Sequence, residues 1–485
     1  MIDRKEAKQQ GLWIGDFLLK VSPDDMIIYM ENEEGDPEFA RNLQENWEYL
    51  KSRLVEEGIK GVLPEPEVVE GKIVVAKGTP PKPPVSERYE LEEKFLPLLE
   101  EIGERYCEKL IKTLEKNFNK EDLRDLCRKI ICAEKDEVIA KWFPAVPGVP
   151  GYNVWGDPLE PPGLKEEKKI TLGENVYIDE KEKVVKAKFS GVVKLENFVL
   201  EVYPEYEIKG DVDFSIGNVY FKGKRLTVKG DVKFGFKVIS EGEFILEGCT
   251  ENKVHIEVNG DFFCKGIIRG EETFVKVTGN AEIKGVEYAV IEVKGNLKVE
   301  NYLIFSKTLV EGELEATSGK GIIYGGEVKV AGNIKAGILG NESQTATRVF
   351  AGHDPDLIEP YLSLVQKKLI LKENLMKISY GIMLGERLKE EGRMSPDKEK
   401  IWLKLREEYG RAEEELRSIR EKIKDLEKKI KEFKTKVIQV KERIYPGVTV
   451  GIAEISMVVP EEKRGPLEFY LMADVIQSRR PEKDE

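Results

Sequence analysis

Residues 254–296 read VHIEVNGDFFCKGIIRGEETFVKVTGNAEIKGVEYAVIEVKGN, and this stretch decides the fold. Within it a glycine followed by Asp or Asn recurs at Gly260, Gly279 and Gly295, with short runs of alternating apolar and polar residues between. The pattern continues in both directions, with Asp, Asn or Glu after Gly210, Gly230, Gly242, Gly312 and Gly332, and with Gly352-His353 at its end. A repeat of 12 (242 − 230) to 20 (230 − 210) residues, built only from strand-like pieces, is typical of a β-solenoid.

The repeat also predicts how the coils are built. Equivalent positions of successive coils stack about 4.8 Å apart, with Val, Ile, Leu and Phe pointing inward. We expect the glycines at one or two stacked corners, because glycine tolerates a positive φ, and we expect the following Asp or Asn to accept hydrogen bonds from nearby backbone amides. A calcium-binding array is the alternative, but it needs dense Gly-Gly-x-Gly-x-Asp repeats, which the sequence lacks.

Composition bounds the class of protein. The chain has 485 residues, too many for one ordinary core, and its net charge of 78 − 91 = −13 disfavours a nucleic-acid partner. No run approaches the roughly 20 apolar residues of a membrane-spanning helix, so we expect no membrane span. The five cysteines lack any C-x-x-C pair and favour free thiols in a reducing cytoplasm over a metal site; they are Cys107, Cys127, Cys132, Cys249 and Cys264.

Two long helical arms follow the repeat. The first is expected from Asp354-Pro355 to about Glu391, with apolar residues at Leu362, Val365, Leu369, Leu375, Ile378 and Ile382. The second begins at Ser395-Pro396, and its apolar residues are spaced alternately by 3 and 4: Trp402, Leu405, Tyr409, Ala412, Leu416, Ile419, Ile423, Leu426, Ile430, Phe433, Val437, Val440 and Ile444. Such spacing predicts a coiled-coil seam, and the short connection makes the arms antiparallel.

These patterns predict a mainly β protein divided into seven segments. They are an N-terminal α/β unit (1–85), a helical insertion (86–142), a Pro/Gly-rich crossing without regular structure (143–168), the β-solenoid (169–353), an antiparallel coiled-coil hairpin (354–445), strands returning to the solenoid (446–476) and a disordered tail (477–485).

Several motifs, in this order along the chain, resemble those of the flagellar assembly protein A family. They are Gly58-Ile59-Lys60-Gly61-Val62, Val75-Ala76-Lys77-Gly78-Thr79-Pro80-Pro81, Pro150-Gly151-Tyr152-Asn153-Val154-Trp155-Gly156, Gly217-Asn218-Val219-Tyr220-Phe221-Lys222-Gly223, Gly230-Asp231-Val232, Tyr324-Gly325-Gly326 and Ile338-Leu339-Gly340. The resemblance spans nearly all 485 residues. It implies a right-handed parallel β-helix and a cytoplasmic role in motility or polar organisation, through protein contacts rather than catalysis.

The residues themselves offer little for catalysis. The two histidines are His255, expected to face outward on a strand, and His353, expected to help cap a turn between the solenoid and the first arm. Because the sequence has no hexapeptide repeat, nucleophile elbow, Walker loop or zinc motif, we expect no catalytic, cofactor or metal site. The favoured function is a non-enzymatic scaffold or adaptor. The alternative is a carbohydrate- or ligand-binding β-helix, which would need outward carboxylates and aromatic platforms.

Two surfaces are candidates for a protein partner. The first is the tip of the hairpin, Gly392, Arg393, Met394, Ser395 and Pro396, where we expect Met394 to be exposed between charged neighbours. The second is the N-terminal unit. A basic run from Lys428 to Lys436 is interpreted as a solvated helix face. The sequence leaves a homo-oligomer open and does not identify the partner.

Overall fold

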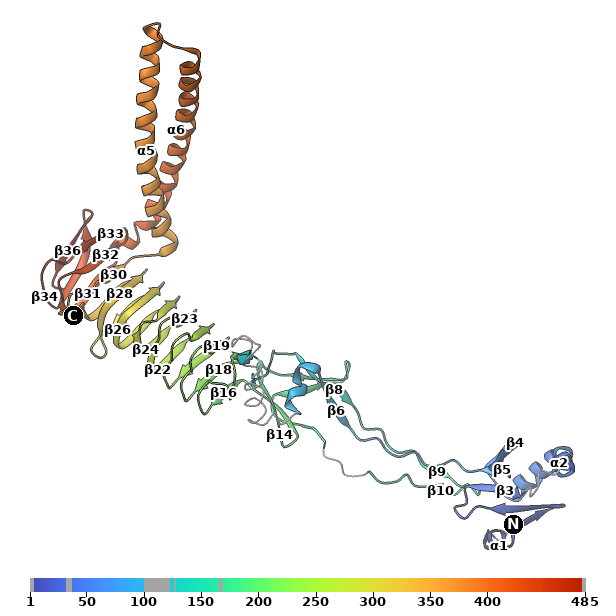
Figure 1. Ribbon diagram of the computed structural model, residues 1–485. Coiled ribbons are helices and arrows are strands. Elements are labelled where there is room, and N and C mark those ends of the chain that lie inside the picture. The colour runs from blue at the N-terminus through green and yellow to red at the C-terminus, as the bar shows by residue number, and fades with distance from the viewer. Residues whose placement is uncertain (1–3, 32–36, 100–122, 126–127, 165–168, 482–485) are drawn as a thin grey trace.

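The computed structural model describes residues 4–31, 37–99, 123–125, 128–164 and 169–481. Figure 1 shows an N-terminal unit joined by extended chain to a β-region, a solenoid beyond it, and a pair of long helices projecting from the far end of the solenoid. The predicted fold class is confirmed: the protein is mainly β, with a parallel β-solenoid and an antiparallel helical hairpin.

The N-terminal unit is one sheet covered by a helix. Its elements are α1 (Arg4–Gln10), β1 (Leu12–Ile14), β2 (Phe17–Val21), β3 (Ile27–Glu31), α2 (Pro37–Glu56), β4 (Val62–Val69) and β5 (Lys72–Lys77), with sheet order β1-β2-β3-β5-β4. Leu43, Trp47, Leu50 and Leu54 recur at helical spacing on α2 and pack in the same core as Leu19 and Ile28. Val154 and Trp155, far along the chain, complete that core.

The expectation that the Pro/Gly-rich crossing (143–168) has no regular structure is wrong, because its residues 146–152 pair with residues 79–85. The amides of Thr79, Lys82 and Val85 donate to Tyr152, Val149 and Val146 respectively, at 2.7–2.9 Å, and these three donate back. The bonds fall at every third residue, which is the period of polyproline II, so the prolines between them need no amide donor. Gly151 permits the close approach, since a Cβ there would lie 2.2 Å from the carbonyl oxygen of Thr79.

A two-sheet β-region replaces the predicted start of the solenoid at residue 169. Its elements are β6 (Arg88–Leu91), η1 (Glu93–Leu98), β7 (Cys132–Ala133), β8 (Val138–Phe143), β11 (Thr171–Leu172), β12 (Val176–Asp179), β13 (Val184–Ala187), β14 (Gly191–Glu196) and β15 (Val199–Tyr203); the short pair β9 (Gly151–Tyr152) and β10 (Pro158–Leu159) precedes β11. The sheets β11-β15-β14-β7 and β12-β13-β8-β6 share one core. The described parts of the predicted helical insertion (86–142) are therefore mostly strands, with helix only in η1 and at residues 123–125; residues 100–122 and 126–127, which include Cys107 and Cys127, lie outside the described residues.

The solenoid begins at Glu205 and joins 21 strands. They are β16 (Glu205–Ile208), β17 (Val219–Phe221), β18 (Arg225–Val228), β19 (Lys237–Ser240), β20 (Glu243–Leu246), β21 (His255–Val258), β22 (Phe262–Arg269), β23 (Phe274–Val277), β24 (Ala281–Glu287), β25 (Val290–Val293), β26 (Leu297–Val310), β27 (Leu314–Ala316), β28 (Ile322–Val330), β29 (Ile334–Leu339), β30 (Thr347–Ala351), β31 (Ile438–Ile444), β32 (Val448–Ile452), β33 (Ile455–Val458), β34 (Lys463–Arg464), β35 (Leu467–Met472) and β36 (Val475–Arg479).

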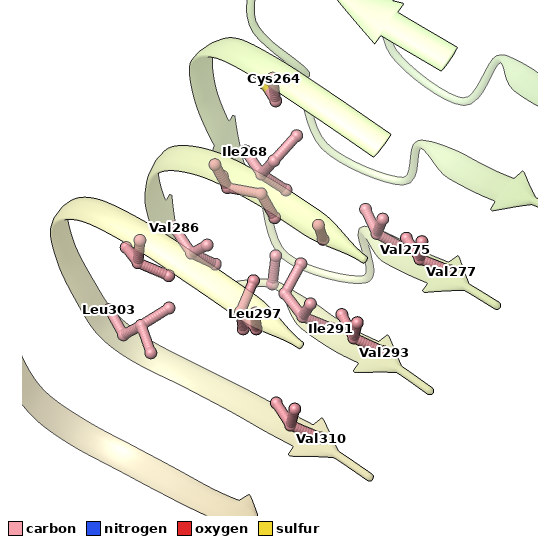
Figure 2. Close-up of a cluster of buried hydrophobic side chains, with 14 of the residues drawn as sticks. Cys264, Ile268, Val275, Val277, Val286, Ile291, Val293, Leu297, Leu303 and Val310 are labelled. Carbon is pink, nitrogen blue, oxygen red and sulfur yellow. The ribbon is translucent and has the colours of Figure 1, made fainter. Parts of the chain in front are cut away.

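Successive coils stack in parallel register, so like residues follow one another through the core. Ile268 pairs with Val286, which pairs with Leu303 in the next coil. Figure 2 shows these side chains inside the coils, together with a second column that includes Val277, Val293 and Val310. The alternating apolar residues of the repeat therefore line one continuous core, as the sequence predicts.

The glycines lie at two stacked corners, as expected, but for a different reason. Gly230 donates to the carbonyl of Gly210 at one corner, whereas Gly260, Gly279, Gly295, Gly312, Gly332 and Gly352 form a ladder of such bonds at the other. Of the nine glycines in the series, all described, only Gly352 has a positive φ. A Cβ on Gly312 would lie 2.5 Å from the carbonyl oxygen of Gly295. Glycine is therefore required by the close approach of neighbouring backbones.

The Asp and Asn residues bond to the next coil. Asp261 Oδ1 accepts from the amide of Asn280 at 2.8 Å, and Asn280 Oδ1 accepts from the amide of Asn296 at 2.9 Å. Asp231 Oδ1 accepts from Cys249 in the same way, and this bond is the main reason that the pKa of Asp231 is lowered. Each Asp or Asn that follows a glycine of the series thus extends the backbone ladder across the corner.

The hairpin is inserted at this second corner without disturbing the ladder. The chain leaves after Gly352, whose amide donates to Gly332, and returns at Val437, whose amide donates to Asn333 Oδ1 at 3.0 Å. Between these points lie α5 (Pro355–Glu390), α6 (Pro396–Ile430) and η2 (Phe433–Thr435). Asp354 and Ser395 cap the two helices, as the sequence predicts.

The seam is shorter than predicted. Trp402, Leu416, Ile419, Ile423 and Ile430 are buried on α6, but Val440 and Ile444 lie on β31 and point into the solenoid. The alternating spacing of three and four residues continues into β31 only because the inward residues of this strand, Val440 and Ile444, fall at matching positions by coincidence. On α5, the buried or half-buried positions include Tyr361, Leu364, Val365, Lys368, Leu371, Leu375, Ile378, Gly381, Ile382 and Gly385, whereas Leu362 and Leu369 are exposed and lie outside the seam.

The C-terminal strands close the open end of the solenoid. β35 pairs antiparallel with β31, and β36 pairs with β35. Phe469 and Ile476 from these strands join the solenoid core. The predicted disordered tail from residue 477 is therefore wrong as far as Arg479, where β36 ends.

Replacing Gly312 by Ala tests the close approach of the coils. We expect the free energy of unfolding to fall by about 1–3 kcal/mol, because the new Cβ overlaps the backbone of Gly295. Gly210→Ala is the matched control, since nothing lies within 4 Å of a Cβ there. Denaturant unfolding of both variants is the measurement, and equal losses would contradict the explanation.

Replacing Leu416 and Ile423 together by Asp tests whether the hairpin folds as its own unit. Both side chains are buried in the seam, at 6% and 4% exposure, and an unpaired buried charge costs about 3–5 kcal/mol. We expect far-UV circular dichroism to lose helix while limited proteolysis leaves the solenoid intact. Arg417→Asp with Lys424→Asp, on the exposed side, should retain the hairpin; loss of the whole fold in one transition would contradict an independent unit.

Candidate interaction surfaces

The hairpin tip is a closed turn held by backbone bonds. Gly392 has φ +67°, and the amides of Gly392 and Arg393 donate to Lys389 and Leu388 at 3.2 and 2.9 Å. Arg393, Ser395, Gly392 and Pro396 are exposed, whereas Met394 is half-buried. The expectation of an exposed Met394 is therefore wrong, because the structure partly covers this side chain.

Trp402 stabilises the end of the hairpin below the tip. Its indole N–H donates to the carbonyl of Ile382 at 3.2 Å, and its ring lies where a Cβ of Gly385 would be. Lys389 and Arg406 place their charges 4.9 and 5.0 Å from the ring centre. These cation–π contacts hold both helices to one anchor, so the tip is presented on a rigid support.

The outer side of α5 exposes more apolar surface than the tip. Met376, Tyr380 and Met383 are 66%, 68% and 62% exposed. The sequence analysis assigned part of this line, Leu362 and Leu369, to the seam. The heptad phase distinguishes this exposed line from the seam. Leu362, Leu369, Met376 and Met383 recur every seven residues, and each follows a seam residue by one position.

Two lysines of the basic run at the root of the hairpin, Lys428 and Lys434, are ion-paired. Lys434 Nζ lies 2.6 Å from Glu454 Oε1 and 3.1 Å from Asp474 Oδ1, and Lys428 Nζ lies 3.4 Å from Asp425 Oδ1. The first two pairs tie the returning chain to the C-terminal strands. This arrangement fits a structural role better than a site for a polyanion.

The outer face of the solenoid carries a shallow groove lined by charged residues that pair with each other. Arg225 Nε lies 2.5 Å from Glu243 Oε1, and Lys298 Nζ lies 3.9 Å from Glu282 Oε1; Ile245, Phe263 and Ile283 line the groove as well. A corner nearby carries an aromatic column that sequence reasoning missed. The rings of Tyr288 and Phe305 stack 5.0 Å apart, and Tyr324 meets Phe305 edge-on at 5.7 Å.

The N-terminal unit also exposes aromatic side chains. Trp13 on β1 and Tyr49 on α2 are 66% and 57% exposed, and Val68 on β4 is 75% exposed. These residues are scattered over three elements. This unit therefore offers a second candidate surface, with less contiguous apolar area than α5.

The two histidines occupy different environments. His255 is half-buried on the outer surface of β21, stacks on Phe274 and lies 2.7 Å from Glu257 Oε1. His353 is 5% exposed at the hairpin root, and neither ring nitrogen has a hydrogen-bond partner among the described residues. Burial, followed by nearby Lys329, lowers the pKa of His353 below its ordinary value of 6.5, against opposing contributions from Glu359 and Glu327.

Three further observations concern the described part of the chain. Cys132, Cys249 and Cys264 are free thiols. No group of three or more His, Cys, Asp and Glu side chains is arranged there to hold a metal ion. None of the described helices is both long and apolar enough to span a membrane.

His353 predicts an acid-sensitive fold. Above about pH 6.5 the imidazole is neutral in the folded and unfolded chain, so it does not affect stability. Below that pH the unfolded chain takes up a proton that the folded chain resists, which costs up to about 1.4 kcal/mol per pH unit. His353→Gln should therefore lose less stability between about pH 8 and pH 5 in denaturant unfolding. The difference in stability between this variant and the natural chain at pH 8 measures the cost of the altered packing at residue 353. A variant with the same pH dependence as the natural chain would contradict the prediction.

Two models of one protein family match this chain. Residues 17–197 match the model of the Flagellar Assembly Protein A N-terminal region, and residues 204–476 match that of the Flagellar Assembly Protein A beta solenoid domain. The boundary between the two matches falls at the start of the solenoid, Glu205. No curated protein and no solved structure matches the chain. Because the two matches cover nearly the whole chain, it belongs to the flagellar assembly protein A family.

Proposed function

We propose that this chain is a non-enzymatic, cytoplasmic scaffold or adaptor that acts in flagellar assembly through contacts with other proteins. The observation that carries the proposal is the hairpin. Its 36- and 35-residue helices reach roughly 50 Å from the solenoid, at about 1.5 Å per residue. Only its root, with Ile358 and Ile430 packed on Ala453, contributes to a core shared with the body. An arm of this length serves the fold little and suits contact with a distant partner.

The charges on the solenoid support a role without turnover. Carboxylates that act as acid and base need a shared cleft and separate environments. Here Glu243, Glu247 and Glu282 each pair with a neighbouring Arg or Lys on an open sheet face. Exposed pairs of this kind organise a surface but do not prepare a carboxylate for proton transfer.

The contact that we propose is the tip, Gly392, Arg393, Met394, Ser395 and Pro396. Arg393 is the accessible charge there, with 72% of its side chain exposed and a 3.1 Å pair to Glu391 on the same turn. A guanidinium presented on a rigid turn suits a carboxylate on a partner protein. Point substitutions at the tip test this contact without disturbing Trp402, which anchors the end of the hairpin.

Arg393→Glu should weaken capture of flagellar assembly proteins by the purified chain and reduce swimming of the host cells. Arg417→Glu is the matched control, because Arg417 is equally exposed, at 84% of its side chain, but lies on the shaft of α6. Quantitative co-purification and motility on soft agar are the measurements. If the two variants behave alike, the tip is not the contact, and the N-terminal unit becomes the candidate surface.

The alternative, a carbohydrate- or ligand-binding β-helix, has one observation in its favour. Tyr288 and Phe305 are 52% and 40% exposed at one corner of the solenoid. However, Tyr288 covers one face of Phe305, and Tyr324 lies against the same ring edge-on. A sugar needs a free ring face, so saturable glycan binding that Tyr288→Ala abolishes would be required to prefer this function.

A further inference from the structure

Helix α5 carries an apolar line that α6 does not cover. We call it the outer face of α5: Leu362, Leu369, Ile370, Met376, Tyr380, Met383 and Leu384, which are 44%, 62%, 54%, 66%, 68%, 62% and 51% exposed. It spans the 21 residues from Leu362 to Met383, or about 31 Å. Single exposed apolar residues are normal, but seven of them on one side of a single helix mark an interaction site.

We propose that the outer face of α5 binds the same face of a second copy of this chain, with the two α5 helices antiparallel. A two-fold axis would then pass α5 between Lys372 and Glu373. Such an isologous interface requires a surface that is complementary to itself.

The apolar line has this self-complementary order. Leu369 lies as far before the point between Lys372 and Glu373 as Met376 lies after it. The same holds for Leu362 and Met383, and for half-buried Val365 and Tyr380. An antiparallel pair centred there would therefore place these three pairs of apolar side chains opposite each other.

The charged residues at the centre of the outer face of α5 also favour a second copy of this chain as the partner. Lys372 and Glu373 interrupt the apolar line and are both exposed. In the antiparallel pair Lys372 of one copy would face Glu373 of the other, twice. Glu373 Oε1 already lies 2.8 Å from Lys377 Nζ of the same helix, so it would sit between two ammonium groups. In a parallel pair, Lys372 would face Lys372 and Glu373 would face Glu373.

The buried area predicts a reversible dimer. A side chain of this size carries roughly 100 Å² of apolar surface, so covering seven that are about half to two-thirds exposed removes roughly 400 Å² per chain. A standard interface buries about 800 Å² per partner, and the aliphatic stems of flanking lysines would add to the total. We therefore expect monomer and dimer to exchange, with the two solenoids at opposite ends of a four-helix arm.

Sedimentation equilibrium of the full chain over a range of concentrations tests the proposal. The average mass should rise from the 55.3 kDa of one chain toward twice that value. Leu369→Glu with Met376→Glu should remain at 55.3 kDa throughout. Leu403→Glu is the matched control, because it introduces charge at a 50% exposed leucine on α6, and it should dimerise like the natural chain.

Charge reversal tests the orientation. Lys372→Glu should weaken the dimer by roughly 2- to 30-fold, since two ion pairs of about 0.2–1 kcal/mol each are lost. Adding Glu373→Lys should restore it, because the two charges simply exchange places across the axis. A dimer that the single change leaves unaltered, or that the double change does not restore, would overturn antiparallel pairing.

A disulfide tests the register independently. Leu369→Cys with Met376→Cys should form a cross-linked dimer on mild oxidation, visible on a non-reducing gel. The two positions lie about 10.5 Å apart in one helix, beyond the roughly 7 Å limit for a disulfide, so they cannot close within one chain. Either single variant should give no dimer in this register. A chain that stays monomeric at every concentration, or a dimer unaffected by the paired Glu substitutions, would overturn the proposal.

Discussion

The solenoid depends on the close approach of successive backbones at one corner. There the amide of each glycine donates to the carbonyl of the glycine one coil earlier, from Gly279 to Gly352. The Asp or Asn that follows adds a side-chain bond to the next coil, as Asn280 does to Asn296. Both contacts need a residue without a Cβ at the corner. The spacing of these glycines therefore sets the register of every strand in the core.

The same corner explains how a long hairpin can be inserted into a solenoid. The chain departs after Gly352 and returns at Val437, and the ladder continues across the gap through Asn333. The inserted segment thus closes a loop whose ends lie side by side on one coil, next to Gly332 and Asn333 of the coil before. Its helices are stabilised chiefly by each other and by the root around Ile358 and Ile430. A projecting arm and an undisturbed β-core can therefore coexist.

The hairpin differs from the solenoid in what it leaves exposed. On the solenoid, outward carboxylates are matched by lysines or arginines on neighbouring coils, as Glu247 is by Lys265. On α5, apolar residues face water along about six turns, and Lys372 and Glu373 lie at their centre. Paired charges make a surface soluble, whereas an apolar line gains free energy when another surface covers it. Interaction through the arm is the function to which this difference points.

The sequence by itself determined the repeat, the corners, both helix caps and the seam around Leu416 and Ile423, because strand alternation and heptad spacing are local patterns. Tertiary structure decided where those patterns end. Val440 and Ile444 continue the heptad spacing but belong to a strand, since pairing with β29 and β35 outweighs helical preference. It also decided which of two apolar lines on α5 packs against α6, leaving Leu369 and Met376 exposed, and it left Met394 half-buried at the tip. Spacing gives the phase of a helix, but only its neighbour determines which side is covered.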